Sequence, residues 1–159
     1  AHSYPETDAL QKVETALASL QTTDLPILQK AHRDWWHNYY PQSFVSLPDK
    51  KMENFYWAQM YKLASATRIG GGLLDNSGPW QVLTPWPNAW WNLNVQLSYW
   101  SVYASNRLEL GMPLVNAIGS NLNNLINNVP EAYRKDAAAL PVATDFNLIG
   151  ETVNTETRH

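Results

Sequence analysis

The sequence predicts an all-α chain, and two observations carry that prediction. Apolar side chains recur every three or four residues over most of the length, which is the period of an amphipathic helix. Proline and glycine stand between the periodic segments, where helices end. Only residues 42–47 alternate in the manner of a short strand. Helical hairpins joined by loops of unequal length are therefore expected.

Three helices are predicted in the N-terminal half. The first covers residues 6–20, where four apolar side chains share one stripe: Leu10, Val13, Leu17 and Leu20. The second covers residues 24–40 and begins at an N-cap, Asp24. The third carries the strongest signal, because Asp49 is a good N-cap and residues 50–68 present an aromatic-rich face.

A long loop separates these helices from the rest of the chain. The glycines at 70–72 end the third helix, and about twenty residues rich in proline and tryptophan follow, a length that is uncommon and often functional. Helices are then predicted over 94–105, 112–129 and 131–139. The polar side of the second of these is rich in asparagine rather than charged. Residues 141–159 lack periodicity and are predicted as coil, which leaves 1–140 as the helical portion.

The composition indicates that part of the surface is covered by a partner. Charged residues make up 16% of the 159 residues, against about a quarter in a typical soluble domain, while the hydrophobic fraction is 45%. A piece of a larger unit, or an obligate oligomer, fits that balance. Of the two, the piece is favoured.

Charge and residue usage argue against several function classes. The net charge is −3 and the basic residues are scattered, so nucleic acid is not an expected partner. The chain has no cysteine, and His32 and His37 are too far rotated on a helix to chelate one ion, so neither a metal nor a cofactor is predicted. No apolar run reaches the ~18 residues of a membrane span, and the polar N-terminus is not a signal peptide. No membrane partner is expected.

Residues 80–100 form the most informative cluster. Five of the eight tryptophans lie there, with two prolines and an Asn-x-Asn pair. A tryptophan face stacks on the apolar face of a sugar ring, and amide groups bind the polar rim. The predicted sugar contacts are Trp80, Trp86, Trp90 and Trp91. The alternative is burial in a core, which is usual for single aromatic side chains.

Asn92 and Asn94 are the candidates for a catalytic role. They are two residues apart, so they share a face only on extended backbone. Two amide carbonyls can orient a water molecule that a nearby carboxylate deprotonates, and Asp75 and Glu109 are the two acidic residues retained for such work. The alternative makes Asn94 an N-cap and Asn92 a turn residue. Arg68 either satisfies the last carbonyls of its helix or contacts substrate.

The segment from Tyr61 to Leu114 resembles the helical catalytic domain of glycoside hydrolase family 95, the inverting α-L-fucosidase family and its relatives. Its centre matches the family's Asn-x-Asn-x-Gln-x-x-Tyr-Trp pattern at five positions: Asn92, Asn94, Gln96, Tyr99 and Trp100. Shorter matches flank this pattern in the same order: YKLASATR at 61–68, GPW at 78–80, PW at 85–86, NRLE at 106–109 and PL at 113–114.

The resemblance implies an (α/α)6 toroid of the six-hairpin glycosidase type, of which this chain supplies the N-terminal part. It implies that Asn92 and Asn94 position the water that attacks a glycosidic bond with inversion. An Asp base and a Glu acid from later hairpins would complete the site, and neither has a match in this chain. Fucosidases of the family carry a histidine where this chain has Trp90, so the sugar is left open. The expected partners are a carbohydrate substrate and the remainder of the parent barrel or a second copy. The expected location is periplasmic or extracellular.

Three functions follow from these patterns. The leading prediction is part of a glycoside hydrolase catalytic domain that is inactive by itself, since it lacks the acid. The second is a non-catalytic carbohydrate-binding module that uses the aromatic loop as a platform, with Asn92 and Asn94 dispensable. The third is a helical interaction domain in which all tryptophans are buried.

Overall fold

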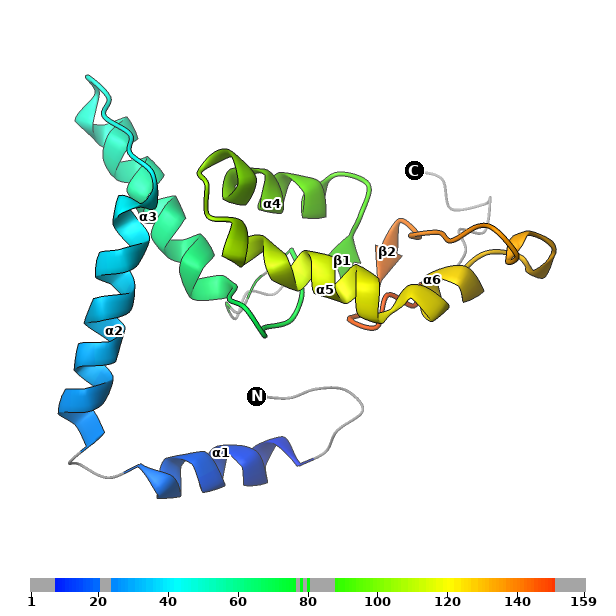
Figure 1. Ribbon diagram of the computed structural model, residues 1–159, viewed down its shortest axis with the longest axis horizontal. Helices are drawn as coiled ribbons and strands as arrows, with labels where there is room; N and C mark the ends of the chain where they lie inside the picture. The colour runs from blue at the N-terminus through cyan, green and yellow to red at the C-terminus, as the bar shows by residue number, and fades with distance from the viewer. Residues whose placement is uncertain (1–7, 21–23, 77, 79, 81–87, 151–159) are drawn as a thin grey trace. The chain divides into compact units, whose positions relative to one another are not determined.

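The computed structural model describes residues 8–20, 24–76, 78, 80 and 88–150. Over these residues the chain is mostly helical with two short strands, which confirms the all-α prediction in its coarse form (Figure 1). The chain divides into two compact units, residues 1–44 and residues 45–159. Each unit is described separately below.

The first unit consists of two helices. Helix α1 spans Ala9–Ser19 and buries no side chain, although it carries the predicted apolar stripe. Helix α2 spans Leu25–Tyr39, and Asp24 stands at its N-cap position, although its side chain forms no cap hydrogen bond. A 3-10 turn, η2, continues it over Tyr40–Gln42. The strand-like segment 42–47 forms no strand.

Aromatic rings stack along helix α2. Trp35 lies on Tyr39 with 5.1 Å between ring centroids, and Trp36 lies on Tyr40 at 5.4 Å. Each pair is separated by four residues, the spacing that places side chains over one another on a helix. The sequence run from Trp35 to Tyr40 therefore forms a local aromatic ladder.

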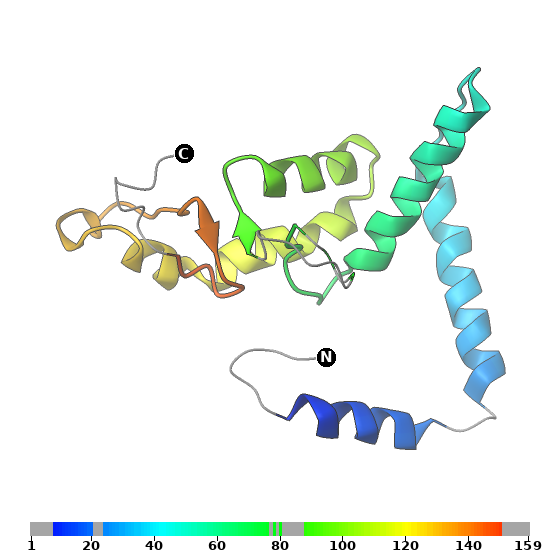
Figure 2. The ribbon, with the colours of Figure 1, turned by 180° about the vertical axis from the view of Figure 1, so that it is seen from behind.

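The second unit contains the other elements. Its helices are α3 (Lys50–Ala66), α4 (Asn94–Ala104), α5 (Met112–Ser120) and α6 (Leu122–Asn127). Its 3-10 turns are η3 (Leu108–Gly111) and η4 (Glu131–Tyr133). Strand β1 (Ala89–Trp90) pairs antiparallel with strand β2 (Ala143–Thr144). The 3-10 turn η3 joins α4 to α5 and contacts both helices (Figures 1 and 2).

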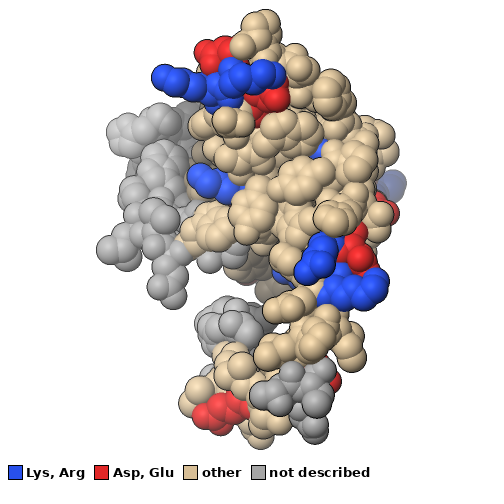
Figure 3. Space-filling view, turned by 90° about the vertical axis from the view of Figure 1, so that its left-hand side faces the viewer, with Lys and Arg blue, Asp and Glu red and all other residues tan. Residues whose placement is uncertain are grey.

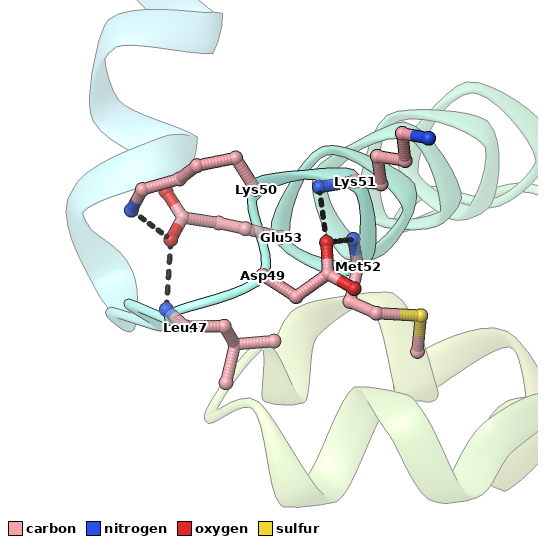
Figure 4. Close-up of polar contacts among 6 residues, drawn as sticks. All are labelled: Leu47, Asp49, Lys50, Lys51, Met52 and Glu53. Carbon is pink, nitrogen blue, oxygen red and sulfur yellow. Dashed lines mark hydrogen bonds and ion pairs between the residues drawn. The ribbon is translucent and has the colours of Figure 1, made fainter.

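Helix α3 begins where the sequence predicts. The Asp49 carboxylate accepts hydrogen bonds from the backbone N–H groups of Lys51 and Met52, at 2.8 and 3.4 Å (Figure 4). Glu53 reaches back across the same turn and accepts from the N–H of Leu47 and the ammonium of Lys50, both at 2.8 Å. Together these bonds satisfy N–H groups that a helix start leaves without helical partners.

Tyr99 joins three parts of the core of the second unit. It lies on α4 and is 1% exposed. Its hydroxyl accepts a hydrogen bond from the backbone N–H of Leu74 at 3.1 Å and is also hydrogen-bonded to Thr67, just after α3. Burial raises the pKa of Tyr99, so the hydroxyl stays neutral at physiological pH. The long loop is thereby fixed against both helices at Leu74.

The segment after residue 140 departs from the predicted coil, because it contains strand β2. Besides the β1–β2 pairing, the Trp91 backbone N–H donates to the carbonyl of Val142 at 2.8 Å. The indole N–H of Trp91 donates to the Thr144 hydroxyl, also at 2.8 Å. Two residues are too few to show an alternating pattern, so no pattern in the sequence predicts this strand. These contacts hold residues 142–144 in the second unit.

The asparagine-rich helix predicted over 112–129 is two helices, α5 and α6, with Asn121 between them. The Asn121 amide donates to the carbonyl of Ala117 at 2.8 Å, a side-chain bond that competes with the helical ladder. The helix predicted over 131–139 is also shorter, since only the 3-10 turn η4 forms there. A short polar segment gains little from burial, which explains the early end.

Candidate functional site

A pocket of about 330 Å³ lies in the second unit between α3, α4 and the loop that follows α3. Helix α3 contributes one face to it: Gln59, Met60, Lys62, Leu63 and Ala66. Helix α4 contributes Leu97, Ser98 and Ser101, and the loop contributes Leu74, Asp75, Asn76, Gly78 and Trp80. Its volume lies at the lower end of the range for small-molecule sites.

The floor of the pocket is apolar and its rim is polar. Met60 is 3% exposed and Leu74 is 9% exposed, and both belong to the core beneath the pocket. Gln59 and Asp75 are half-buried, whereas Asn76 and Lys62 are exposed. A ligand that fits must combine an apolar surface with several hydrogen-bonding groups, which is the character of a sugar ring.

A tight turn shapes the loop side of the pocket. The Gly78 N–H donates to the Asp75 carbonyl at 3.3 Å, and Gly78 adopts φ +60°, a conformation that favours glycine. A Cβ at Gly78 would lie 3.5 Å from ring atoms of Trp80, so the indole ring is close to the turn. Trp80 is 47% exposed and retains ring surface for a ligand.

The serine side chains of α4 face the pocket mainly as hydrogen-bond acceptors. Ser98 Oγ donates to the Asn94 carbonyl at 2.9 Å, and Ser101 Oγ donates to the Ser98 carbonyl at 3.4 Å. Each hydroxyl has one proton, so these bonds leave the oxygen lone pairs available. Acceptors suit sugar hydroxyl groups, which donate.

Asn94 is not among the residues that line this pocket. It is the first residue of α4, four and seven residues before Ser98 and Ser101, so it is on the same helix face. Asn92 precedes it in a turn, and residues 91–93 are not extended as a shared water site requires. Both asparagines are exposed, and neither side chain forms a hydrogen bond with the described part of the chain.

The alternative assignment of Asn94 as an N-cap is wrong. Leu93 stands at the N-cap position of α4, and no side chain caps that helix. Asn92 is a turn residue, as that alternative expected. The side chain of Asn94 is therefore not used by its own helix start.

The other residues predicted to contact a sugar do not gather at the pocket. Trp91 is 7% exposed and its N–H is hydrogen-bonded to Thr144, which leaves little of the ring for a ligand. Trp90 is half-buried in strand β1. Arg68 is exposed just after α3, outside the lining of the pocket. Trp86 lies outside the described residues.

Arg107, the basic residue of the NRLE segment, has a structural role. Arg107 is 1% exposed, its guanidinium donates to the Ser105 carbonyl at 3.1 Å, and its Cζ lies 5.9 Å from the centroid of the Trp57 ring. Asn106 before it has φ +57°, which asparagine tolerates better than most residues. The NRLE segment thus turns the chain after α4. Glu109, in η3, does not line the pocket.

Sequence reasoning missed several pocket residues, although a signal was present. Gln59, Lys62 and Ala66 follow the i, i+3, i+7 spacing of one helix face, and Ser98 and Ser101 follow the i, i+3 spacing of another. The spacing does not show that these faces of α3 and α4 line the same pocket. That information came only from the packing of Tyr99 against Leu74.

The pocket supports binding chemistry better than complete hydrolysis. Asp75 is the sole carboxylate among the described residues that line it, whereas glycoside hydrolysis uses a pair. Within the described ranges, no group of three His, Cys, Asp or Glu side chains is placed to hold a metal ion.

No helix among the described residues combines the length and apolar character needed to cross a membrane. On the face drawn in Figure 3, charged side chains occur in a few separate groups, some of mixed sign, and most of the surface is uncharged.

Comparison of the chain with protein-family models, with curated proteins and with solved structures gives no match.

Proposed function

We propose that this chain recognises a carbohydrate through the pocket between α3 and α4. The observation that carries the proposal is the pairing of a partly exposed tryptophan, Trp80, with a polar rim above an apolar floor. Stacking on Trp80 provides affinity for the apolar face of a sugar. Asn76 and Gln59, together with the two serines of α4, provide hydrogen bonds to its hydroxyl groups.

The proposal extends to a glycoside hydrolase catalytic domain of which this chain is one part. The resemblance to family 95 supports it through Asn92 and Asn94, and Asn94 begins the helix that contributes Ser98 and Ser101 to the pocket. The remaining carboxylate would come from the rest of an (α/α)6 toroid, which would also cover the exposed helix faces. A periplasmic or extracellular location and an inverting outcome belong to the same proposal.

Sugar binding is tested by titrating the chain with mono- and oligosaccharides while tryptophan fluorescence is recorded. Trp80→Ala should weaken binding by up to about tenfold, since an aromatic contact contributes about 0.5–1.5 kcal/mol and 1.4 kcal/mol is a factor of ten. Trp100→Ala is the matched control, because Trp100 is 63% exposed and does not line the pocket. Equal affinity of the two variants for every sugar would refute the site.

A non-catalytic carbohydrate-binding module is the second candidate. One observation favours it, which is that the pocket already contains stacking and hydrogen-bonding groups but only one carboxylate. Aryl glycoside assays separate the two candidates. The catalytic reading expects negligible turnover by this chain and turnover by the complete barrel. The binding-module reading expects sugar binding with no turnover by either.

A further inference from the structure

The geometry points to an anionic sugar as the ligand of the pocket, with its carboxylate or sulfate group bound by Lys62. This inference rests on the proposed function and goes further, because it specifies the chemical class of the sugar. Four observations carry it: the place of Lys62, its charge, the lack of an acidic residue near it on α3 and the other groups in the pocket.

Lys62 differs from the lysines that form ion pairs. Lys50 pairs with Glu53 within α3, and Lys30 pairs with Asp34 within α2. Lys62 forms no ion pair with any residue that the structure describes. No acidic residue lies within four positions of it on α3, so the helix supplies no counter-charge.

Lys62 also lies where a ligand would meet it. It lines the pocket from the α3 face, next to Gln59 and Leu63, and the pocket opens between this face and the loop that holds Trp80. A lysine ammonium has three N–H donors and no acceptor. A bond from it to an anionic oxygen is stronger than a bond to a neutral hydroxyl.

The other residues of the pocket limit where the anionic group of a bound sugar can lie. Helix α4 has no charged residue, so its two serines can bind hydroxyl groups of either a neutral or an anionic sugar. Asp75 lines the loop side and repels an anion. The anionic group must therefore face α3, while the sugar ring stacks on Trp80.

The test is calorimetric titration of the full chain with sugars that differ only in the group at C6. Methyl glucuronide is compared with methyl glucoside, methyl galacturonide with methyl galactoside, and glucose 6-sulfate with glucose. We expect the anionic sugar in at least one pair to bind about tenfold tighter or more, by the difference between charged and neutral hydrogen bonds. Its affinity should fall as salt is raised. The pair that shows the preference identifies carboxylate or sulfate as the bound group.

Variants assign the preference to Lys62. Lys62→Gln should reduce the affinity for the anionic sugar to that for its neutral counterpart, whereas Lys62→Arg should retain most of the preference. Lys51→Gln is the matched control, since Lys51 is an exposed lysine of the same helix outside the pocket. Asp75→Asn should strengthen binding of the anionic sugar, because it removes a like charge and keeps an acceptor.

The outcomes separate this inference from the proposed function. If neutral and anionic sugars bind equally and Lys62→Gln changes neither, the assignment of charge is wrong and carbohydrate recognition stands. If no sugar of either kind binds, both are wrong. If Lys51→Gln and Lys62→Gln lower the affinity equally, the preference comes from general charge and the site at Lys62 is refuted.

Discussion

Two groups of asparagines in the second unit serve different ends. Asn92 and Asn94 precede and begin α4, are exposed, and form no side-chain hydrogen bond with the described part of the chain. Asn124 and Asn128, in and just after α6, donate to carbonyl groups of the segment 139–148. The same side chain is thus left available in one region and bound to the fold in the other. Availability, rather than residue type, identifies candidates for ligand contact.

Asn124 and Asn128 hold a loop whose backbone is strained. Asn128 is 8% exposed, and its amide donates to the Leu148 carbonyl at 2.8 Å and the Ala139 carbonyl at 3.2 Å. Leu148 is fully buried and adopts φ +58°, a conformation that costs free energy for a leucine. The Asp145 carboxylate accepts the N–H groups of Asn147 and Ile149, each at 2.9 Å. These polar bonds maintain a backbone that local preference disfavours.

The largest expected effect concerns Asn94, one of the two asparagines whose side chains form no bond within the described fold. In the complete enzyme of the proposed function, Asn94→Ala should lower kcat by about 100-fold and leave KM nearly unchanged, as expected for a group that acts in the transition state. The free energy of unfolding should not change, because the Asn94 side chain forms no bond within the described fold. Steady-state kinetics and urea unfolding measure the two effects. A variant with lower stability and a normal kcat would show that Asn94 supports the fold and does not act in catalysis.

Asn128→Ala should destabilise the chain by about 2 kcal/mol, because it leaves one buried and one partly buried carbonyl group without their donor. Urea unfolding of the variant measures this loss. Asn123→Ala is the matched control, since Asn123 is exposed in α6, the helix that ends just before Asn128, and its side chain has no hydrogen bond among the described residues. Its effect should stay within about 0.5 kcal/mol. Similar losses in both variants would contradict a special role for Asn128.

Asn124→Ala should cost less, about 1 kcal/mol, since its main bond is one donation to the Asn147 carbonyl at 2.8 Å and the site is half-buried. Amide hydrogen exchange adds spatial detail. Protection should fall in residues 145–149 and remain unchanged in α4. A uniform loss of protection across the second unit would show that the bond is not local to this loop.

The smallest expected effect concerns Glu53, a polar side chain bound to its own helix start. The hydrogen bond from Lys50 and the N–H of Leu47 hold the pKa of Glu53 below its usual value of 4.5. Its contribution to stability is therefore present above pH 4.5 and is lost as the pH falls through the lowered pKa. Unfolding measured from neutral to acidic pH should show wild type and Glu53→Gln converging. A constant difference at all pH values would exclude this origin.

The sequence allowed part of the fold to be predicted, and the reasons are local. The start of α3 was predicted because a cap needs only Asp49 and the next few residues. The β1–β2 pair was not, because it joins residues that are far apart along the chain through two-residue strands. The break between α5 and α6 depends on the amide of Asn121, which a count of apolar positions does not weigh.

The sequence predicted some residues of the candidate site, but not which of them lie together in one pocket. Trp80 was named from composition alone, and the structure places it at the pocket. Trp91 was named by the same reasoning and is buried against Thr144. Both are tryptophans of one segment, and nothing in their local sequence distinguishes them. Burial depends on distant residues, so it could not be predicted from the segment.

By itself the sequence determined where helices start, which faces are apolar and which residue types are suited to a sugar, since these depend on neighbours within a few positions. Only the tertiary structure decided which of those residues share a site. The contact of Tyr99 with Leu74 fixes the loop against α3 and α4, and so brings Trp80, Lys62 and the serines of α4 to one pocket. The physical reason is that a pocket is a relation between surfaces, and this relation arises when distant apolar side chains are buried together.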